Sequence, residues 1–134
     1  MRTFEGTITE LKPNQIFVFG SNTQGRHGKG NALLARQKFG AIYGQSEGLQ
    51  GQSFAIITKD LTKRIHPSRS QDQILSQILM LYDFAEKNPD KEFVVCYTTE
   101  KNLNYFTPKY MAQMFSNFTI PDNISFNQEF AKLF

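Results

Sequence analysis

The sequence predicts one α/β domain in which helices cover both faces of a central mixed or mostly parallel sheet, a three-layer sandwich. Three features of the chain lead to this prediction. Short apolar runs alternate with helical segments, and glycines collect in the loops after the first of these runs. The length of 134 residues suits a single hydrophobic core. We therefore expect residues 1–134 to form one domain.

The first half of the chain reads as strand, loop, helix, loop and strand. Residues 16–19 form a continuous apolar run typical of a strand buried within a parallel sheet. A loop over 21–30 follows, and the helix after it ends at Gly40. A polar, glycine-rich loop at 44–52 then leads into a second strand at 53–57. In such folds ligands bind beyond the carboxyl ends of the strands, which is where both glycine loops are expected.

The alternation continues after a basic connector at 59–69. Ser70 followed by Gln73 is a capping-box pattern, which predicts a helix that ends before Pro89. Residues 93–97 form a third apolar run and the third predicted strand.

Two shorter helices complete the prediction. Thr107 and Pro108 form an N-cap and first helical residue, and Asn127 is a candidate cap for a terminal helix. We expect the methionines and phenylalanines of this half to fill the core, and Cys96 to be a small buried hydrophobe.

Positive charge is concentrated in the half of the chain that holds the glycines. The net charge is +3, but the segment from Gly20 to Arg69 carries eight Lys or Arg against two acidic residues, a local balance of +6. All nine glycines lie at or before Gly51. This distribution predicts an anionic partner, while a solvated basic face with no ligand is the alternative.

The loop at 20–30 has the features of an anion site. Its glycines allow the backbone to approach a ligand, and the following helix directs its free N–H groups and positive dipole end at the same place. Arg26 and Lys29 lie within the loop. The Lys-Ser/Thr pair of a P-loop is missing, and no acidic residue stands at the spacing of a dinucleotide-binding fold. Nucleotide hydrolysis of the P-loop type is therefore not expected.

Several polar side chains are candidates for the ligand itself. Asn22 could hold a ribose or a water, or could instead order the loop, and His27 could contact a phosphate or transfer a proton. The loop at 44–52 offers Gln50 to a base or ribose edge, or is a structural turn. After the third strand, side chains at 98–106 could close over a ligand by stacking. The predicted ligand-binding residues are Gly20, Ser21, Asn22, Gly25, Arg26, His27, Gly28, Gly30, Gln50, Thr98, Asn102 and Tyr105.

Other classes of site lack their residues. One cysteine and two histidines support neither a disulfide framework nor a zinc site, so we expect no metal and no cofactor. No Ser-His-Asp set and no carboxylate pair is evident, and His66 is expected at the surface. The N-terminus lacks the apolar stretch of a signal peptide, and no run is long enough to span a membrane. A cytoplasmic location is expected.

Two blocks of sequence resemble a family of small phage and bacterial proteins. The blocks are FVFGSNTQGRHGKG at 17–30 and FGAIYGQSEGLQGQSFAIITKD at 39–60. The family pattern is FVFGSN..GRHG.G followed by FGA..GQ..GLQGQSYAIPT, with weaker matches in YMAQMFSNF and PDNISFNQEF. The family in turn is similar to macro domains, the modules that bind ADP-ribose, in its order of strand, Asn-bearing glycine loop and helix.

The resemblance implies a placement for the ligand. Residues 20–22 would lie near the distal ribose, and residues 25–30 would wrap the diphosphate. One departure matters: the family carries a glycine-containing loop after the third strand, whereas this chain has CYTTEKNLNYF. That difference puts the second phosphate contact, and any hydrolase activity, in doubt.

Three functional hypotheses follow. The leading one is a binding protein that sequesters an ADP-ribose-like or other small nucleotide signal, acting as a phage anti-defence sponge in the host cytoplasm and needing no catalytic residue. The second is an ADP-ribosyl hydrolase or transferase in which Asn22 positions water and His27 is acid or base. The third, ranked below a small nucleotide partner, is a nucleic-acid-binding module that uses the connector at 59–69. Aromatic residues in the second half also suggest a homo-oligomer.

Overall fold

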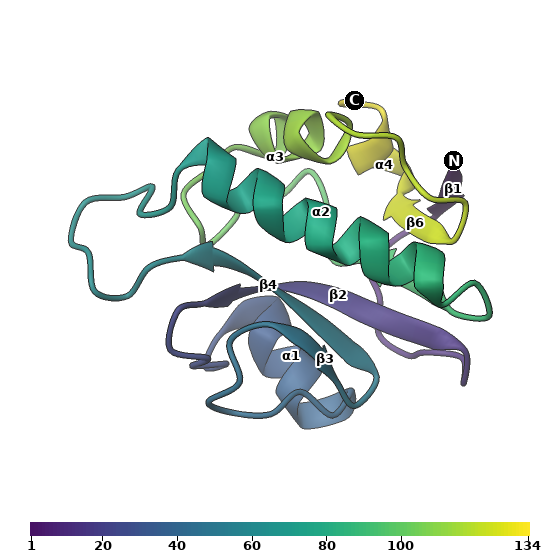
Figure 1. Cartoon of the computed structure of the whole chain (residues 1–134), viewed down its shortest axis with the longest axis horizontal. Helices are drawn as coiled ribbons and strands as arrows, with labels where there is room; N and C mark the ends of the chain where they lie inside the picture. Colours follow the sequence, from purple (N-terminus) through teal and green to yellow (C-terminus); the bar gives the residue numbers. More distant parts are fainter.

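A six-stranded sheet runs through the middle of the molecule in the computed structural model, which describes residues 1–134 (Figure 1). The strand order is β1-β6-β5-β2-β4-β3. Five strands are parallel, and only β3 is antiparallel to its neighbour β4. The predicted mixed, mostly parallel sheet is confirmed. The strands are β1 (Arg2–Phe4), β2 (Gln15–Asn22), β3 (Gly48–Gln50), β4 (Ser53–Lys59), β5 (Glu92–Val95) and β6 (Ile124–Asn127).

Helices cover both faces of this sheet. Figure 1 shows α1 on one face, beneath β2 and β4, and α2 with α3 and α4 on the other. The predicted three-layer α/β sandwich is therefore present. None of the helices combines the length and the apolar character needed to cross a lipid bilayer. The helices are α1 (Gly30–Lys38), α2 (Gln71–Lys87), α3 (Pro108–Phe115) and α4 (Gln128–Ala131).

The helix starts follow from their capping residues. At α2, the Ser70 hydroxyl accepts a hydrogen bond from the Gln73 N–H at 3.2 Å, and the Gln73 side chain accepts one from the Ser70 N–H at 2.9 Å. At α3, Thr107 accepts from the backbone of Tyr110 and Pro108 is the first helical residue. Each such cap typically contributes about 1 kcal/mol to helix stability. The capping patterns of the sequence are thus confirmed.

The pleat of β2 divides its side chains between the two faces. Phe17 and Phe19 point to the same face, where Phe17 packs against Phe39 with ring centroids 5.1 Å apart. The opposite core contains the aromatic rings of Phe115, Phe126 and Phe130. Each of these fully buried rings contributes about 1.5–3 kcal/mol to folding through its burial.

Three strands were not predicted from the sequence. β1 and β3 have three residues each and lie at the two edges of the sheet, so neither forms an apolar run. β6 has the sequence ISFN, in which Ser125 and Asn127 are buried. Asn127 donates to the Gly6 carbonyl at 2.8 Å and also accepts from Phe130 N–H, as the expected cap of α4. Because its polar residues form hydrogen bonds with residues far away in the sequence, β6 lacks the apolar run that indicates a buried strand.

The order in which successive strands are added to the sheet reverses at β2, because β4 lies on one side of β2 and β5 on the other. The chain passes from β2 through α1 to β4 on one side, and from β4 through α2 to β5 on the other. A crevice forms where the strand order reverses in this way, outside the carboxyl ends of the strands. The topology therefore predicts a ligand site above the ends of β4, β2 and β5.

Candidate ligand-binding site

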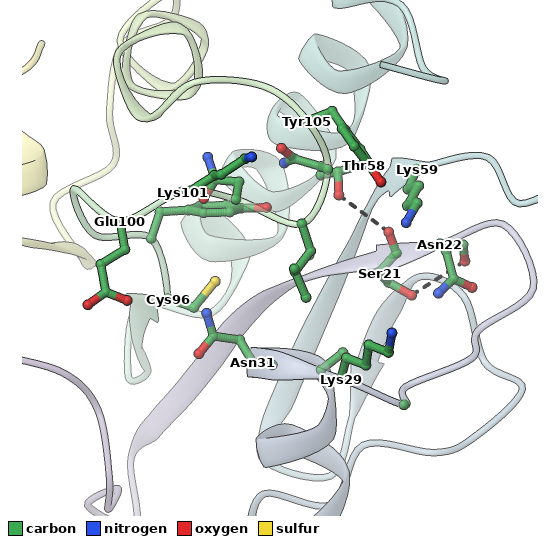
Figure 2. Close-up of a pocket in the computed structure, with 18 of the residues that line it drawn as sticks. Ser21, Asn22, Lys29, Asn31, Thr58, Lys59, Cys96, Glu100, Lys101 and Tyr105 are labelled. Carbon is green, nitrogen blue, oxygen red and sulfur yellow. Dashed lines mark hydrogen bonds between the residues drawn. The ribbon is translucent and has the colours of Figure 1, made fainter. Parts of the chain in front are cut away.

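A pocket of about 870 Å³ occupies this switch point (Figure 2). Its walls come from the carboxyl ends of β2 and β4, from residues 96–98 directly after β5, and from the first turn of α1. The segment 100–105 closes the remaining side, and Thr7 and Ile8 add an edge. A volume of this size is typical of sites that enclose a nucleotide-sized molecule.

The N-terminus of α1 opens into the pocket. Gly30, Asn31 and Ala32 form its first turn and line the cavity. The N-cap residue, Lys29, makes no side-chain cap, and the first turn contains no acidic residue. The amides of this turn and the positive end of the helix dipole are therefore available to an anion.

Four cationic side chains line the pocket, and one acidic side chain, Glu100, shares it. The four ion pairs of the structure involve other residues, so these cations have no carboxylate partner. Figure 2 shows Asn22 and Lys59 at one side of the view and Glu100 with Cys96 at the other. The lining therefore favours an anionic group near β2, β4 and α1. The cations are Arg26, Lys29, Lys59 and Lys101.

The floor of the pocket contains the hydroxyl of Tyr97. The residue is only 6% exposed, and its hydroxyl makes no hydrogen bond of ordinary geometry. A Cβ added at Gly20 would lie 2.6 Å from this oxygen and 3.1 Å from the hydroxyl of Thr58. Burial raises the pKa of Tyr97 well above its usual range, so the group stays protonated.

Cys96 lies beside Tyr97 and also lines the pocket. Burial raises the pKa of its thiol to about 12, although contacts from the Gly20 backbone and the Asn31 side chain oppose the shift. The side chain is 8% exposed. At neutral pH it is an un-ionised thiol, as expected of a small buried hydrophobe, and is a poor nucleophile.

The loop after β5 is ordered by its own polar side chains. Thr98 accepts a hydrogen bond from Glu100 N–H at 3.1 Å, and Asn102 donates to the Phe106 carbonyl at 3.1 Å. Tyr105, with a positive φ of 70°, stacks on His66 with ring centroids 4.5 Å apart. This stack connects the loop to the basic connector at 59–69 and closes the pocket on that side.

The ring of Tyr105 therefore already contacts other side chains of the protein. Besides the His66 stack, the Lys59 ammonium group lies 5.3 Å from its ring centroid. A nucleobase that stacked on this ring would have to share or replace these contacts. His66, expected at the surface, is only partly exposed because of this packing.

Most of the predicted site residues meet in this pocket, and three do not. Thr58, Lys59 and Tyr97, at or just beyond the ends of β4 and β5, were not predicted, because only the sheet order brings these strand ends together. The predicted residues that line the pocket are Gly20, Ser21, Asn22, Arg26, Gly28, Gly30, Thr98, Asn102 and Tyr105. The additional polar residues of the lining are Thr7, Lys29, Asn31, Thr58, Lys59, Tyr97, Glu100, Lys101 and Asn104.

His27 is a correction to the expected ligand contacts. Its side chain is fully buried outside the pocket lining, with its ring edge-on to Phe19 at 5.1 Å. Its Nε2 lies 3.1 Å from the Gln45 carbonyl and 3.2 Å from the side-chain oxygen of Gln50. Both neighbours are acceptors, so Nε2 carries the proton and donates it. His27 holds two loops together.

Gly25 and Gln50 belong to the same contact between loops and also lie outside the pocket lining. A Cβ at Gly25 would lie 2.5 Å from the carbonyl carbon of Gly44, and Gly44 N–H donates to the Gly25 carbonyl at 2.8 Å. Gln50 accepts from Ile42 N–H at 2.7 Å. The loop at 44–52 therefore supports the first glycine loop from behind, as a structural turn.

The amide of Asn22 is occupied within its own loop. Its oxygen accepts from Arg26 N–H at 2.9 Å and from Gln24 N–H at 3.2 Å, while its nitrogen donates to the Arg26 carbonyl at 2.9 Å. Asn22 thus fixes the shape of the loop that carries Arg26 and Gly28 to the pocket.

Comparison with known proteins adds no assignment. No protein-family model, curated protein or solved structure matches the chain. The pocket lining provides amide and ammonium groups, buried hydroxyls, and a single carboxylate, Glu100. Nowhere in the chain do three or more His, Cys, Asp or Glu side chains gather as metal ligands would.

Proposed function

We propose that this protein binds a phosphate-bearing, nucleotide-like ligand of the ADP-ribose class and holds it without turnover. The observation that carries the proposal is the uncapped N-terminus of α1, which opens into a nucleotide-sized pocket among four cations that have no carboxylate partner. An anion placed there would receive both backbone N–H groups and positive charge.

The arrangement supports binding more strongly than catalysis. The two residues assigned to an enzyme mechanism are both committed elsewhere, Asn22 to its own loop and His27 to the loop behind it. Glu100 is the one acidic side chain in the lining, and it lies at the far side of the view from Asn22 and Lys59 (Figure 2). A general base within reach of a bound phosphate is therefore not evident.

The concave shape of the pocket also favours a small ligand over a nucleic acid. A polynucleotide would need an open basic surface, whereas the cations here line a concave pocket with Tyr105 and Leu61 at one side. In the cell, such a protein would act as a sponge. Sequestration of a host nucleotide signal by a phage protein in the cytoplasm, with or without homo-oligomer formation, is the biological role we attach to the proposal.

The test is a binding panel followed by recovery of the ligand. Purified protein is titrated with ADP-ribose, cyclic ADP-ribose forms, NAD and cyclic oligonucleotides, then denatured, and the released molecule is identified by mass spectrometry. We expect stoichiometric recovery of one intact nucleotide. Recovery of a cleaved product would make the protein an enzyme, and the absence of binding at micromolar concentrations would overturn the proposal.

A further inference from the structure

We infer that Tyr97 and Asn104, beside Thr58, form a second subsite at the floor of the pocket, which binds an uncharged hydrogen-bond acceptor of the ligand. The inference rests on the proposed function, because it assigns the part of the ligand that is not phosphate. In a nucleotide this part is a sugar oxygen, or a ring nitrogen or carbonyl of the base.

The first observation is the hydroxyl of Tyr97, which lies beside the side chains of Thr58 and Asn104 but forms no hydrogen bond of ordinary geometry with either. A buried hydroxyl without a partner costs roughly 1–3 kcal/mol, so such groups are uncommon in folded proteins. The Tyr97 ring packs in the core, where its centroid lies 5.8 Å from that of Phe115 and 6.0 Å from that of Phe130. Its hydroxyl is directed to the pocket floor at Gly20, where the absence of a side chain leaves room for it.

The second observation is the amide of Asn104. Its oxygen accepts from Phe106 N–H at 2.9 Å, which fixes the orientation of the amide. Its nitrogen contacts the sulfur of Met111 at 3.5 Å, and the amide also lies beside the Tyr97 hydroxyl. Thioether sulfur is a weak acceptor, so the NH₂ group retains most of its capacity to donate. Asn104 is 5% exposed and lines the pocket.

The hydroxyl of Thr58 completes this floor. It is 3% exposed, donates a long hydrogen bond of 3.4 Å to the Ser21 carbonyl, and lies beside the Tyr97 hydroxyl. Together the three groups offer donors and carry no charge, because Tyr97 stays protonated. A charged phosphate gains more from the amides and cations at α1, so the floor suits a neutral acceptor.

The experiment compares two buried tyrosines that differ in how their hydroxyls are satisfied. Tyr97→Phe removes the hydroxyl that has no hydrogen bond of ordinary geometry, and Tyr82→Phe removes one that donates to the Phe115 carbonyl at 2.6 Å, away from the pocket. Both changes keep the aromatic ring in the core. Affinity for pyrophosphate, ribose 5-phosphate, AMP and ADP-ribose is measured by calorimetry, and the melting temperature without ligand is measured for each variant.

We expect Tyr97→Phe to lower the affinity for the nucleotide ligands by about 3- to 10-fold, the effect of losing one hydrogen bond. The affinity for pyrophosphate should stay unchanged. The melting temperature of this variant should equal or exceed that of the wild type. Tyr82→Phe should melt at a lower temperature and bind every probe as the wild type does. A loss shared by ribose 5-phosphate assigns the acceptor to the sugar, and a loss seen only from AMP onward assigns it to the base.

Two results would overturn the inference, and they can be told apart. If the wild type binds the probes and Tyr97→Phe binds them equally well, the floor is not a subsite and the proposed function stands. If the wild type binds none of the probes, the proposed function fails and the subsite fails with it.

Discussion

The hydroxyl oxygen of Tyr97 lies 2.6 Å from the position that a Cβ on Gly20 would occupy. Real Cβ atoms do not approach an oxygen so closely, so the tyrosine can reach the pocket floor only because β2 has glycine at this point. The hydroxyl of Thr58, 3.1 Å from the same position, completes the packing. Gly20, predicted as a ligand contact, therefore also makes room for the side chain of Tyr97, two residues after the end of the neighbouring strand β5.

We expect Gly20→Ala to destabilise the fold by about 1–3 kcal/mol, the usual cost of overpacking a core. The added methyl must displace either a ring anchored between α3 and α4 or the end of β4. Urea denaturation measures the change. Combining it with Tyr97→Phe should recover part of the loss, and strict additivity of the two changes would contradict the proposed clash.

His27→Ala tests whether the histidine serves the fold. We expect a loss of about 2–4 kcal/mol in the free energy of unfolding, because the change leaves a cavity against Phe19 and removes the contacts to Gln45 and Gln50. Urea denaturation again gives the value. A variant that kept full stability and lost binding or turnover would instead return His27 to the functional site.

Much of the fold could be predicted from the sequence, because it depends on local patterns. The apolar run at 16–19, the capping box at Ser70 and the Thr107-Pro108 pair each act on neighbouring residues. β6 could not be found this way, since its buried Ser125 donates to Glu92, which is remote in the sequence.

The site was predictable to the same extent. The first glycine loop and the start of α1 lie together in the chain, so their shared role as a pocket wall was visible. Thr58 and Tyr97 reach the pocket only because β4 and β5 flank β2, and the sequence does not state that order. His27 and Gln50 resembled ligand contacts because polar loop residues look the same whether they face a ligand or another loop.

The cations of the pocket should act together on an anion. We expect Lys29→Ala and Lys59→Ala each to weaken binding of a phosphate-bearing ligand several-fold, by about 1 kcal/mol, and to flatten the dependence of affinity on salt. Lys132→Ala is the matched control, since its ammonium group pairs with Glu129 and lies outside the pocket lining. Equal affinities for all three variants in calorimetry would show that the anion lies elsewhere.

Glu92 should make the fold more stable at neutral than at acidic pH. Burial raises its pKa, but hydrogen bonds from Ser125 and Gln15 and the charge of Arg2 outweigh this, so its pKa in the folded protein is lowered. A lowered pKa stabilises the fold above the unfolded value of about 4.3, and this contribution is lost as pH falls through the folded pKa.

Glu92→Gln isolates that contribution. The variant should have a lower urea midpoint than the wild type at neutral pH, and the difference should shrink as the pH falls below about 4.3 and through the lowered pKa of the folded protein. The other carboxyl groups titrate in both proteins, so their contributions to stability cancel in the comparison. A difference that stayed constant with pH would mean that Glu92 acts through packing alone.

Cys96 reports on the pocket without any change to the protein. Because burial raises the pKa of its thiol to about 12, its thiolate fraction should keep rising through the alkaline range. The rate of alkylation in the folded protein should therefore climb up to about pH 10, whereas an ordinary cysteine levels off above its pKa of about 8.5. Mass spectrometry follows the labelling, with urea-unfolded protein as the reference for an accessible thiol.

Since Cys96 lines the pocket beside Asn31, a saturating bound ligand should slow the reaction further. A labelling rate that is the same with and without the ligand would place the ligand away from α1 and β5.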